Sequence, residues 1–294
     1  RVVPSATPVR AATNKQAKIE TPSPAPHTAL PTIARPNVGT IPATLRAVMG
    51  QGENDNYFTR IKAVHALGKK LSSEEFTCLY VLLYRKGGED KLPLDQFNGI
   101  KNDVVEALKA QDAKPADLAR HLMAMFEDSS YDGVWRDYCV QHLGTWYRKV
   151  DSGEEKQAVR DLFWQATEET QSSIAGTTLI ALSSNIDQSE LDKGKIAMKA
   201  LALSEDPKCG ELAKITALQI CAKLGERQVL PAAREIAGSS ASIPLRMSAI
   251  AAVGTLGEES DRPLLEKYAA SSDGRLRTAA QSALKRLGKR GSGE

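Results

Sequence analysis

Histidine, cysteine and acidic side chains are the residues of this chain best suited to chemistry, and their spacing argues against an active site. None of the four histidines lies three or four residues from another, so no helix offers two imidazoles to one metal ion. No HExxH, GxSxG or glycine-rich phosphate loop occurs. The acidic residues are scattered, which suits helix capping and solubility better than paired acid–base catalysis. We therefore predict no catalytic residue, no metal and no cofactor, and a protein that is not an enzyme.

The four cysteines also lack a pattern that would indicate reactivity. Cys78, Cys139, Cys209 and Cys221 form no CxxC pair and no metal-ligand spacing. Two of them, Cys139 and Cys221, fall at apolar positions of the repeated segment described next, which predicts small buried side chains. A disulfide between Cys209 and Cys221 is disfavoured on a single helix, because twelve residues span ~18 Å at ~1.5 Å per residue.

A twelve-residue helical segment recurs along the chain and must position any functional side chain. Its clearest copy is 246–257 (RMSAIAAVGTLG), and the seven copies start at Arg60, Lys101, Arg136, Ala175, Lys214, Arg246 and Arg277. Apolar residues at positions four, five and eight predict one buried helical stripe, and alanine prevails at position seven, where small size allows close helix approach. Positions three, six and ten are mainly polar and predict a solvated face.

The spacing of these copies predicts a helical solenoid. Successive copies start 31 to 41 residues apart, which is room for one helix of the segment, a turn, a second helix and another turn. One helix pair cannot bury its apolar stripe alone, whereas stacked pairs share a continuous core. We predict an all-α fold, a right-handed superhelix of six to seven antiparallel helix pairs over residues 51–290, with a short tail at 291–294.

The sequence from Asp273 to Gly288 (DGRLR, then an alanine-rich helix ending in LG) resembles the HEAT repeat, particularly the short HEAT-like type first associated with bilin lyases. Asp132 to Arg136 (DGVWR) looks like a second copy of the DGRLR sequence that begins this repeat. The resemblance covers about residues 57–288. It implies an armadillo-like superhelix with a ladder of side-chain contacts between successive repeats, made by the residues Asp132, Arg136, Arg246, Asp273 and Arg277.

Residues 1–50 differ in composition from the rest of the chain. Eight of the fourteen prolines lie in the first 42 residues, among Ala, Thr and Ser, and no aromatic residue precedes Tyr57. Such a segment cannot bury enough apolar surface to offset its ordering entropy, which predicts a largely disordered linker. A polyproline-type segment that orders on a partner is the alternative. The composition weakly favours an exported protein whose linker follows a removed signal or membrane anchor.

Aromatic residues concentrate in one part of the predicted array. All three tryptophans fall between residues 131 and 164, and this cluster is either a thicker core or a binding surface. Tyr138 occupies a position that is polar in most copies, so we expect it to face solvent. The net charge of +3 is small against 39 basic and 36 acidic residues, which gives no reason to expect a nucleic-acid partner. No apolar run reaches the ~20 residues of a membrane span.

Two functions from different classes remain open. A curved array presents a long concave surface, so we predict a non-catalytic scaffold that binds a peptide or protein partner there. The predicted contact residues lie on the polar face of the repeated segment: His65, Glu106, Tyr138, Gln141 and Gln219. The resemblance to HEAT-like bilin lyases implies the alternative, an enzyme or chaperone acting on a small ligand or chromoprotein. A metal site at His65, Glu106 and Gln141 is a weaker possibility, because this face is polar wherever it is solvated.

Overall fold

The computed structural model describes residues 33–291 apart from 38, 53, 54, 90, 116 and 189. The predicted linker therefore lies outside the described residues up to position 32, as does the predicted tail beyond 291. Within the described part the chain is entirely helical, with thirteen α-helices and four short 3₁₀ helices. The amino-terminal helices are α1 (Tyr57–His65), α2 (Ser73–Tyr84), α3 (Leu94–Lys109), α4 (Leu118–Glu127), α5 (Gly133–Trp146) and α6 (Gly153–Ala166). The others are α7 (Ile174–Ser184), α8 (Lys193–Glu205), α9 (Glu211–Leu224), α10 (Leu230–Gly238), α11 (Ile243–Leu256), α12 (Arg262–Ala269) and α13 (Gly274–Gly291).

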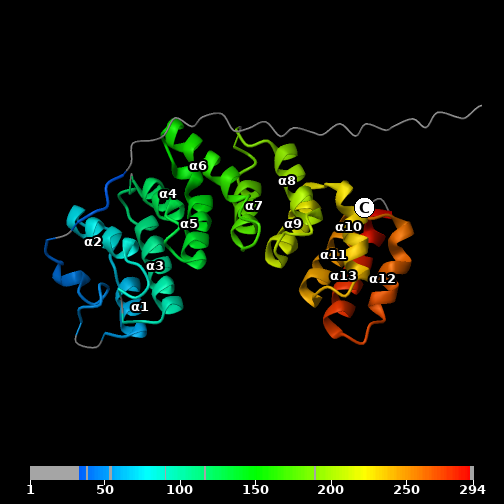
Figure 1. The fold of residues 1–294 in the computed structure, drawn as a ribbon, viewed down its shortest axis with the longest axis horizontal. Coiled ribbons are helices and arrows are strands. Elements are labelled where there is room, and N and C mark those ends of the chain that lie inside the picture. The colour runs from blue at the N-terminus through cyan, green and yellow to red at the C-terminus, as the bar shows by residue number, and fades with distance from the viewer. Residues whose placement is uncertain are drawn as a thin grey trace, which may run out of the picture.

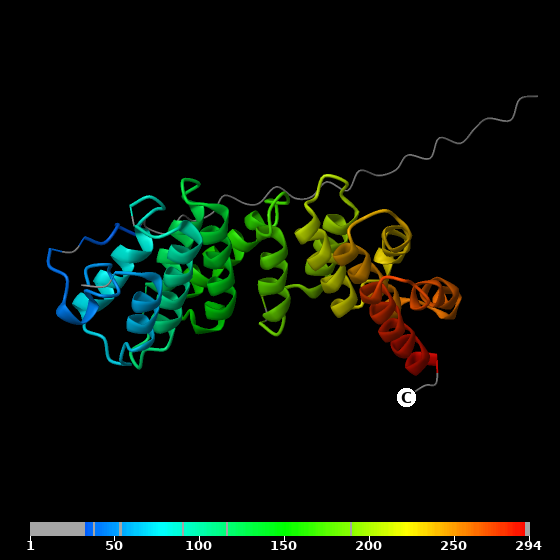
Figure 2. The same cartoon turned by 90° about the horizontal axis from the view of Figure 1, so that it is seen from below.

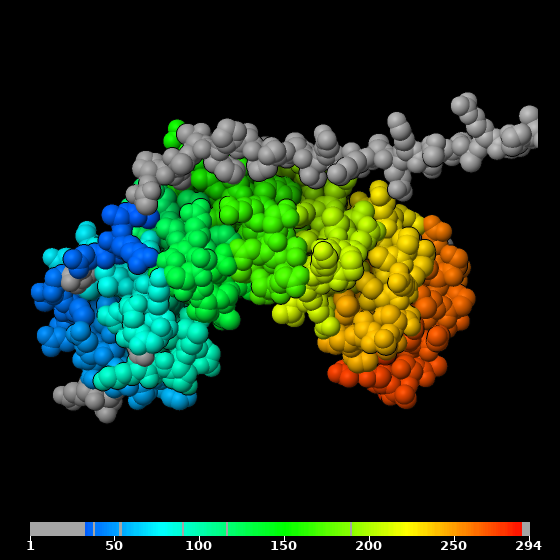
Figure 3. Space-filling view, viewed as in Figure 1, coloured from blue at the N-terminus to red at the C-terminus, as the bar shows by residue number. Residues whose placement is uncertain are grey.

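These helices stack as a curved solenoid, as the sequence predicted. Helices α4, α6, α8, α10 and α12 each pack against the odd-numbered helix that follows, and successive odd-numbered helices pack against one another. The odd-numbered helices carry the repeated segment and line the inner side of the arch (Figures 1 and 2). In the space-filling view the arch encloses a hollow between the cyan amino-terminal repeats and the orange and red carboxy-terminal ones (Figure 3).

Side chains at the predicted apolar positions form one continuous core. At position four, Val104, Cys139 and Ala217 are fully buried, and at position eight Leu108, Leu182 and Val253 are also fully buried. Burial of each large apolar side chain stabilises the fold by roughly 1.5–3 kcal/mol. Because every pair contacts only its neighbours, this stabilisation is distributed along the array rather than gathered at one centre.

Glycine and alanine bring inner helices into direct backbone contact. A Cβ added at Gly254 of α11 would lie 2.3 Å from the Cβ of Ala283 in α13, and one at Gly144 of α5 would lie 2.6 Å from the Cβ of Ala181 in α7. Both alanines occupy position seven of their copies. The close approach expected from the alanines therefore occurs, with glycine on the facing helix.

Polar residues fix where the helices begin. Ser72 and Glu75 form a capping box at α2, and Asp132 accepts the backbone N–H groups of Val134 and Trp135 at α5. Helix α3 begins at Leu94, directly after Pro93 and seven residues before the copy of the repeated segment at Lys101. Gly99 lies inside α3, where the ring of Tyr57 packs against it.

The array also takes side chains from the segment predicted to be a linker. Leu45, Val48 and Met49 are buried, and Thr44 donates a 2.6 Å hydrogen bond to Glu75. The aromatic cluster is mainly core: Trp135, Trp146, Tyr147 and Phe163 are buried, and Trp164 packs partly buried against them. Of the two interpretations of this cluster, the structure supports the thicker core.

Candidate partner-binding surface

Position six of the repeated segment forms an exposed line along the inner helices. His65, Glu106, Gln141 and Gln219 are all exposed, as is Ile180, the position-six residue of α7. Ser282 continues the line on α13, and Ala251 of α11 is half-buried. Four of the five predicted contact residues therefore share one line on the concave side of the array.

Polar contacts between neighbouring helices link parts of this line. The Nε2 atom of His65 lies 2.7 Å from Oδ2 of Asp103 on α3, and Nε2 of Gln219 lies 3.5 Å from Oγ of Ser248 on α11. Both contacts run from position six of one copy to position three of the next. This repetition is what an array with one repeat geometry produces when both positions are polar.

Among the ionisable side chains of this line, Glu106 has the most strongly shifted pKa. Its Oε1 lies 3.3 Å from Nδ1 of His142 and accepts a 2.7 Å hydrogen bond from Lys109. These contacts, with His142 first, lower the pKa of Glu106 to about 2. Burial lowers the pKa of His142, which favours the neutral imidazole. Its Nδ1–H group donates a hydrogen bond to the carboxylate of Glu106. Lys109 also reaches Thr145 on α5 at 2.8 Å. The amino-terminal part of the line therefore holds a carboxylate that stays ionised and is paired with the ammonium of Lys109.

Tyr138 differs from the other predicted contact residues. It is half-buried and packs against the hydrophobic core rather than standing in solvent. Its copy belongs to the aromatic-rich part of the array, where larger side chains fill the space between helices. Only part of its ring is available to a partner.

The predicted Asp–Arg ladder takes another form. Asp132 and Asp273 cap α5 and α13 through backbone N–H groups, and neither side chain is hydrogen-bonded to the arginine four residues later. Each arginine instead donates to a backbone carbonyl near the end of the preceding helix. The pairs are Arg136 to Phe126 at 2.7 Å, Arg246 to Ala237 at 3.2 Å and Arg277 to Ser271 at 2.7 Å.

Contacts between repeats are made at only some of these positions. Asp132 accepts a 2.9 Å hydrogen bond from Asn98 of α3, and Arg136 pairs with Glu169 beyond α6. Asp273 pairs with Arg275 of its own helix. The arginine at position one therefore binds mainly within its own helix pair, because the free carbonyls at a helix end need donors.

The cysteines have the properties of core residues. All four are buried, and burial raises the pKa of Cys78, Cys139 and Cys209 and that of Cys221 to about 12. Reactive cysteines have lowered pKa values and partial exposure, so these thiols have the opposite character. The described residues hold no group of three or more His, Cys, Asp or Glu side chains that could bind a metal ion.

A groove on the outer side of the array was missed by the sequence prediction. It lies between α2 and α4 and is lined by Phe76, Tyr80 and His121, with the amino-terminal segment around Ile33–Pro36 across it. The available signal was the spacing of Phe76, Tyr80 and Tyr84 at every fourth residue, which places three aromatic rings on one face of α2.

The fold and the inner surface define the class of this protein, a helical-repeat solenoid. Residues 196–285, from α8 into α13, match the family model for HEAT repeats, so this part of the array has the HEAT type of repeat. No curated protein and no solved structure matches the chain. HEAT-repeat arrays generally serve as scaffolds for protein interactions. In the described part of the chain, no helix combines the length and the apolar character needed to cross a membrane.

Proposed function

We propose that the chain is a non-catalytic scaffold that binds a peptide or protein partner on its concave side. The exposed line at position six carries this proposal: His65, Glu106 and Gln141 are exposed on α1, α3 and α5, and Gln219 is exposed on α9. These helices line the inner side of the arch (Figure 1). A partner laid along the line meets one residue from each repeat. The ionised carboxylate of Glu106 offers the partner a hydrogen-bond acceptor at the amino-terminal end.

Site-specific photo-crosslinking tests this proposal. A photoreactive amino acid replaces Gln141 or Gln219 on the inner face or, as the matched control, Met198 on α8, which is 59% exposed. We expect one discrete adduct from both inner positions and none from Met198. An adduct formed only at Met198, or equally at all three positions, would contradict the proposal.

The adduct also permits a quantitative test with the partner in purified form. We expect Gln141→Arg, which adds length and charge at the centre of the line, to weaken partner binding at least roughly fivefold. The melting temperature should not change, because the Gln141 side chain is solvent-exposed. A fall in melting temperature with unchanged affinity would assign this residue a structural role.

A further inference from the structure

The groove between α2 and α4 is already crossed by a segment of the chain itself. A cavity of about 460 Å³ remains between this segment and the two helices. Ile33, Ala34 and Pro36 line it on one side, and Phe76, Tyr80 and His121 line it on the other. Both α2 and α4 lie on the outer side of the arch, away from the position-six line (Figure 1).

Aromatic rings form much of the floor of this groove. The imidazole of His121 stacks on the ring of Tyr80 with 4.0 Å between centroids, and its Nδ1 lies 3.1 Å from the hydroxyl of Tyr84. Phe76 extends the row by one helical turn. Grooves lined by aromatic rings suit proline-containing peptides, because the polyproline conformation is extended, already ordered and free of internal hydrogen bonds.

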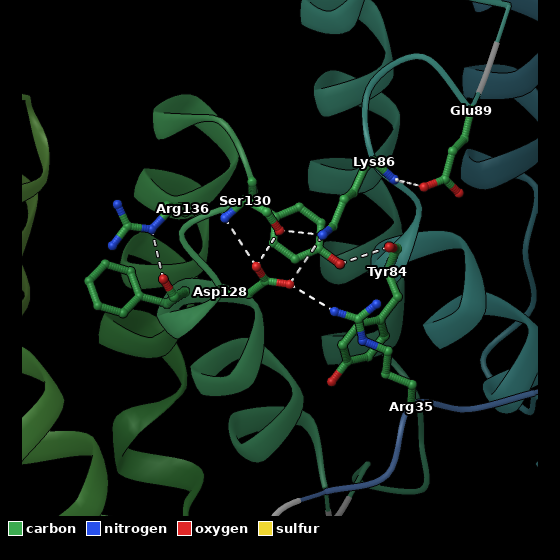
Figure 4. A network of polar contacts seen from close by, with 9 residues as sticks. Arg35, Tyr84, Lys86, Glu89, Asp128, Ser130 and Arg136 are labelled. Carbon is green, nitrogen blue, oxygen red and sulfur yellow. Dashed lines mark hydrogen bonds and ion pairs between the residues drawn. The ribbon is translucent and has the colours of Figure 1, made fainter.

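A carboxylate beside the aromatic row holds the arginine of the crossing segment. Nη2 of Arg35 lies 2.8 Å from Oδ2 of Asp128, and its guanidinium lies 5.7 Å from the ring centroid of Tyr84 (Figure 4). Ser130 and Lys86 also contact Asp128, and these contacts, Ser130 foremost, lower the pKa of Asp128 to about 2. The groove therefore combines a permanent negative charge for arginine with aromatic surface for the proline that follows it.

The crossing segment leaves one polar group of the groove without a hydrogen-bond partner. The hydroxyl of Tyr80 is buried and has no hydrogen-bond partner within the described part of the chain, although Tyr80 lines the cavity and is only 8% exposed. A buried hydroxyl left unpaired destabilises the fold, and a ligand atom that accepts its proton removes that cost. The side chain of Arg35 is 61% exposed, so its ion pair holds the segment weakly.

We propose that this groove is a docking site for an extended Arg-Pro peptide of a partner protein, and that Ile33–Pro36 occupies it in cis until the partner displaces it. The guanidinium of the incoming peptide pairs with Asp128 and its proline packs on the aromatic row. A partner peptide whose backbone runs differently from the crossing segment can accept a hydrogen bond from the hydroxyl of Tyr80 through one of its free carbonyls. This surface is separate from the concave face and goes beyond the scaffold function proposed above.

A labelled peptide with the sequence TIARPNV, taken from the crossing segment, tests the proposal by fluorescence anisotropy on the full chain. We expect Arg35→Ala to bind it at least about threefold more tightly than the unmodified chain, because the tethered competitor is weakened. In the Arg35→Ala background, Asp128→Asn should weaken binding about fivefold or more. The peptide TIAAPNV should bind the Arg35→Ala chain about fivefold or more weakly than TIARPNV does, because it lacks the same ion pair.

Two further variants separate binding from folding. Tyr80→Phe keeps the ring, and in the Arg35→Ala background it should leave TIARPNV binding unchanged, because the crossing segment of this sequence does not pair with the hydroxyl, while the melting temperature stays the same or rises. Asp187→Asn, which removes the exposed carboxylate paired with Arg148, is the matched control and should leave peptide binding unchanged. Equal binding of TIARPNV and TIAAPNV, unchanged binding by Asp128→Asn, or no binding by any variant at about 1 mM peptide would overturn the proposal.

Discussion

The amino-terminal helices α1–α6 and the carboxy-terminal helices α7–α13 share one arrangement but are filled differently. Large rings such as Trp135 and Tyr147 are fully buried in the first half, together with the charged side chains of Arg60 and Lys101. In the second half, alanine fills position four in α9, α11 and α13, and all three of these alanines are fully buried. The segment that matches HEAT repeats lies in this second half.

Repeat length accounts for this difference. Copies of the repeated segment start 35 to 41 residues apart up to Lys214 and 31 or 32 residues apart after it. Longer repeats have more chain to pack between neighbouring helices and use aromatic rings to do so. The closest helix approach, at Gly254 and Ala283, lies among the shorter repeats, and a slightly wider contact of the same kind joins Gly144 and Ala181 across a 39-residue spacing. The first half is therefore filled mainly by large side chains, and close backbone approach is most pronounced in the second half.

The largest effect should come from breaking the backbone contact in the carboxy-terminal half. Gly254→Ala places a Cβ 2.3 Å from that of Ala283, so α11 and α13 must separate. We expect a loss of about 3 kcal/mol in the free energy of unfolding, measured by urea denaturation.

Gly288→Ala is the matched control, because nothing lies within 4 Å of a Cβ added there. It should be neutral or stabilise α13 by up to about 1 kcal/mol, since alanine favours helix over glycine. Equal losses for the two variants would show that the glycine contact does not hold the shorter repeats together.

The buried charged residues of the amino-terminal half should make the free energy of unfolding depend on pH. Burial lowers the pKa of Lys101 from 10.5 to about 8, although its Nζ lies 4.5 Å from the ring centroid of Trp135. Between these two values the unfolded chain binds the proton and the folded chain does not, so stability rises with pH. The unmodified chain should gain about 2 kcal/mol relative to Lys101→Met between about pH 7.5 and about pH 9.5.

Urea denaturation of both proteins across this pH range measures that difference. Groups that titrate equally in the two proteins cancel in the comparison. If the free energies of unfolding of the unmodified chain and Lys101→Met differ by the same amount at every pH, the Lys101 ammonium is solvated in the folded chain. The two halves would then not differ in having a charged core.

A smaller effect should separate the position-one arginines of the two halves. Arg136 donates to Phe126 and to Glu169, and its guanidinium lies 4.7 Å from the Phe126 ring centroid. Arg277 is exposed and donates to Ser271. We expect Arg136→Ala to lower the free energy of unfolding by about 2 kcal/mol and Arg277→Ala by about 0.5 kcal/mol. The reverse order would contradict the idea that the larger repeats depend more on polar contacts.

The predictions from sequence succeeded where one physical signal decided the outcome. Helical periodicity and repeat spacing predicted the solenoid, and the alternation of polar and apolar positions predicted the exposed line that holds Gln141 and Gln219. The start of α3 did not follow from the repeated segment, which begins at Lys101, seven residues after the helix itself starts at Leu94. The segment lies inside a longer helix, which periodicity alone does not delimit.

Contacts between distant parts of the chain could not be predicted in the same way. The groove at Tyr80 depends on Arg35 meeting Asp128 across 93 residues, and neither residue stands in a pattern that indicates the other. The prediction of an Asp–Arg ladder failed for the same reason. Its residues are spaced as the resemblance implies, but backbone carbonyls at helix ends compete for the arginines, and this competition becomes visible only when the helices are placed in space.

The glycine contacts also have a mechanical consequence. Where Gly144 meets Ala181 and Gly254 meets Ala283, backbone presses on backbone, and no side chain between the helices can change rotamer to absorb a rotation. These junctions are stiff. The junctions of α3 with α5 and of α9 with α11 have no such glycine, and we expect them to be the more compliant joints of the arch. Small rotations there would change the distance between the two ends of the arch.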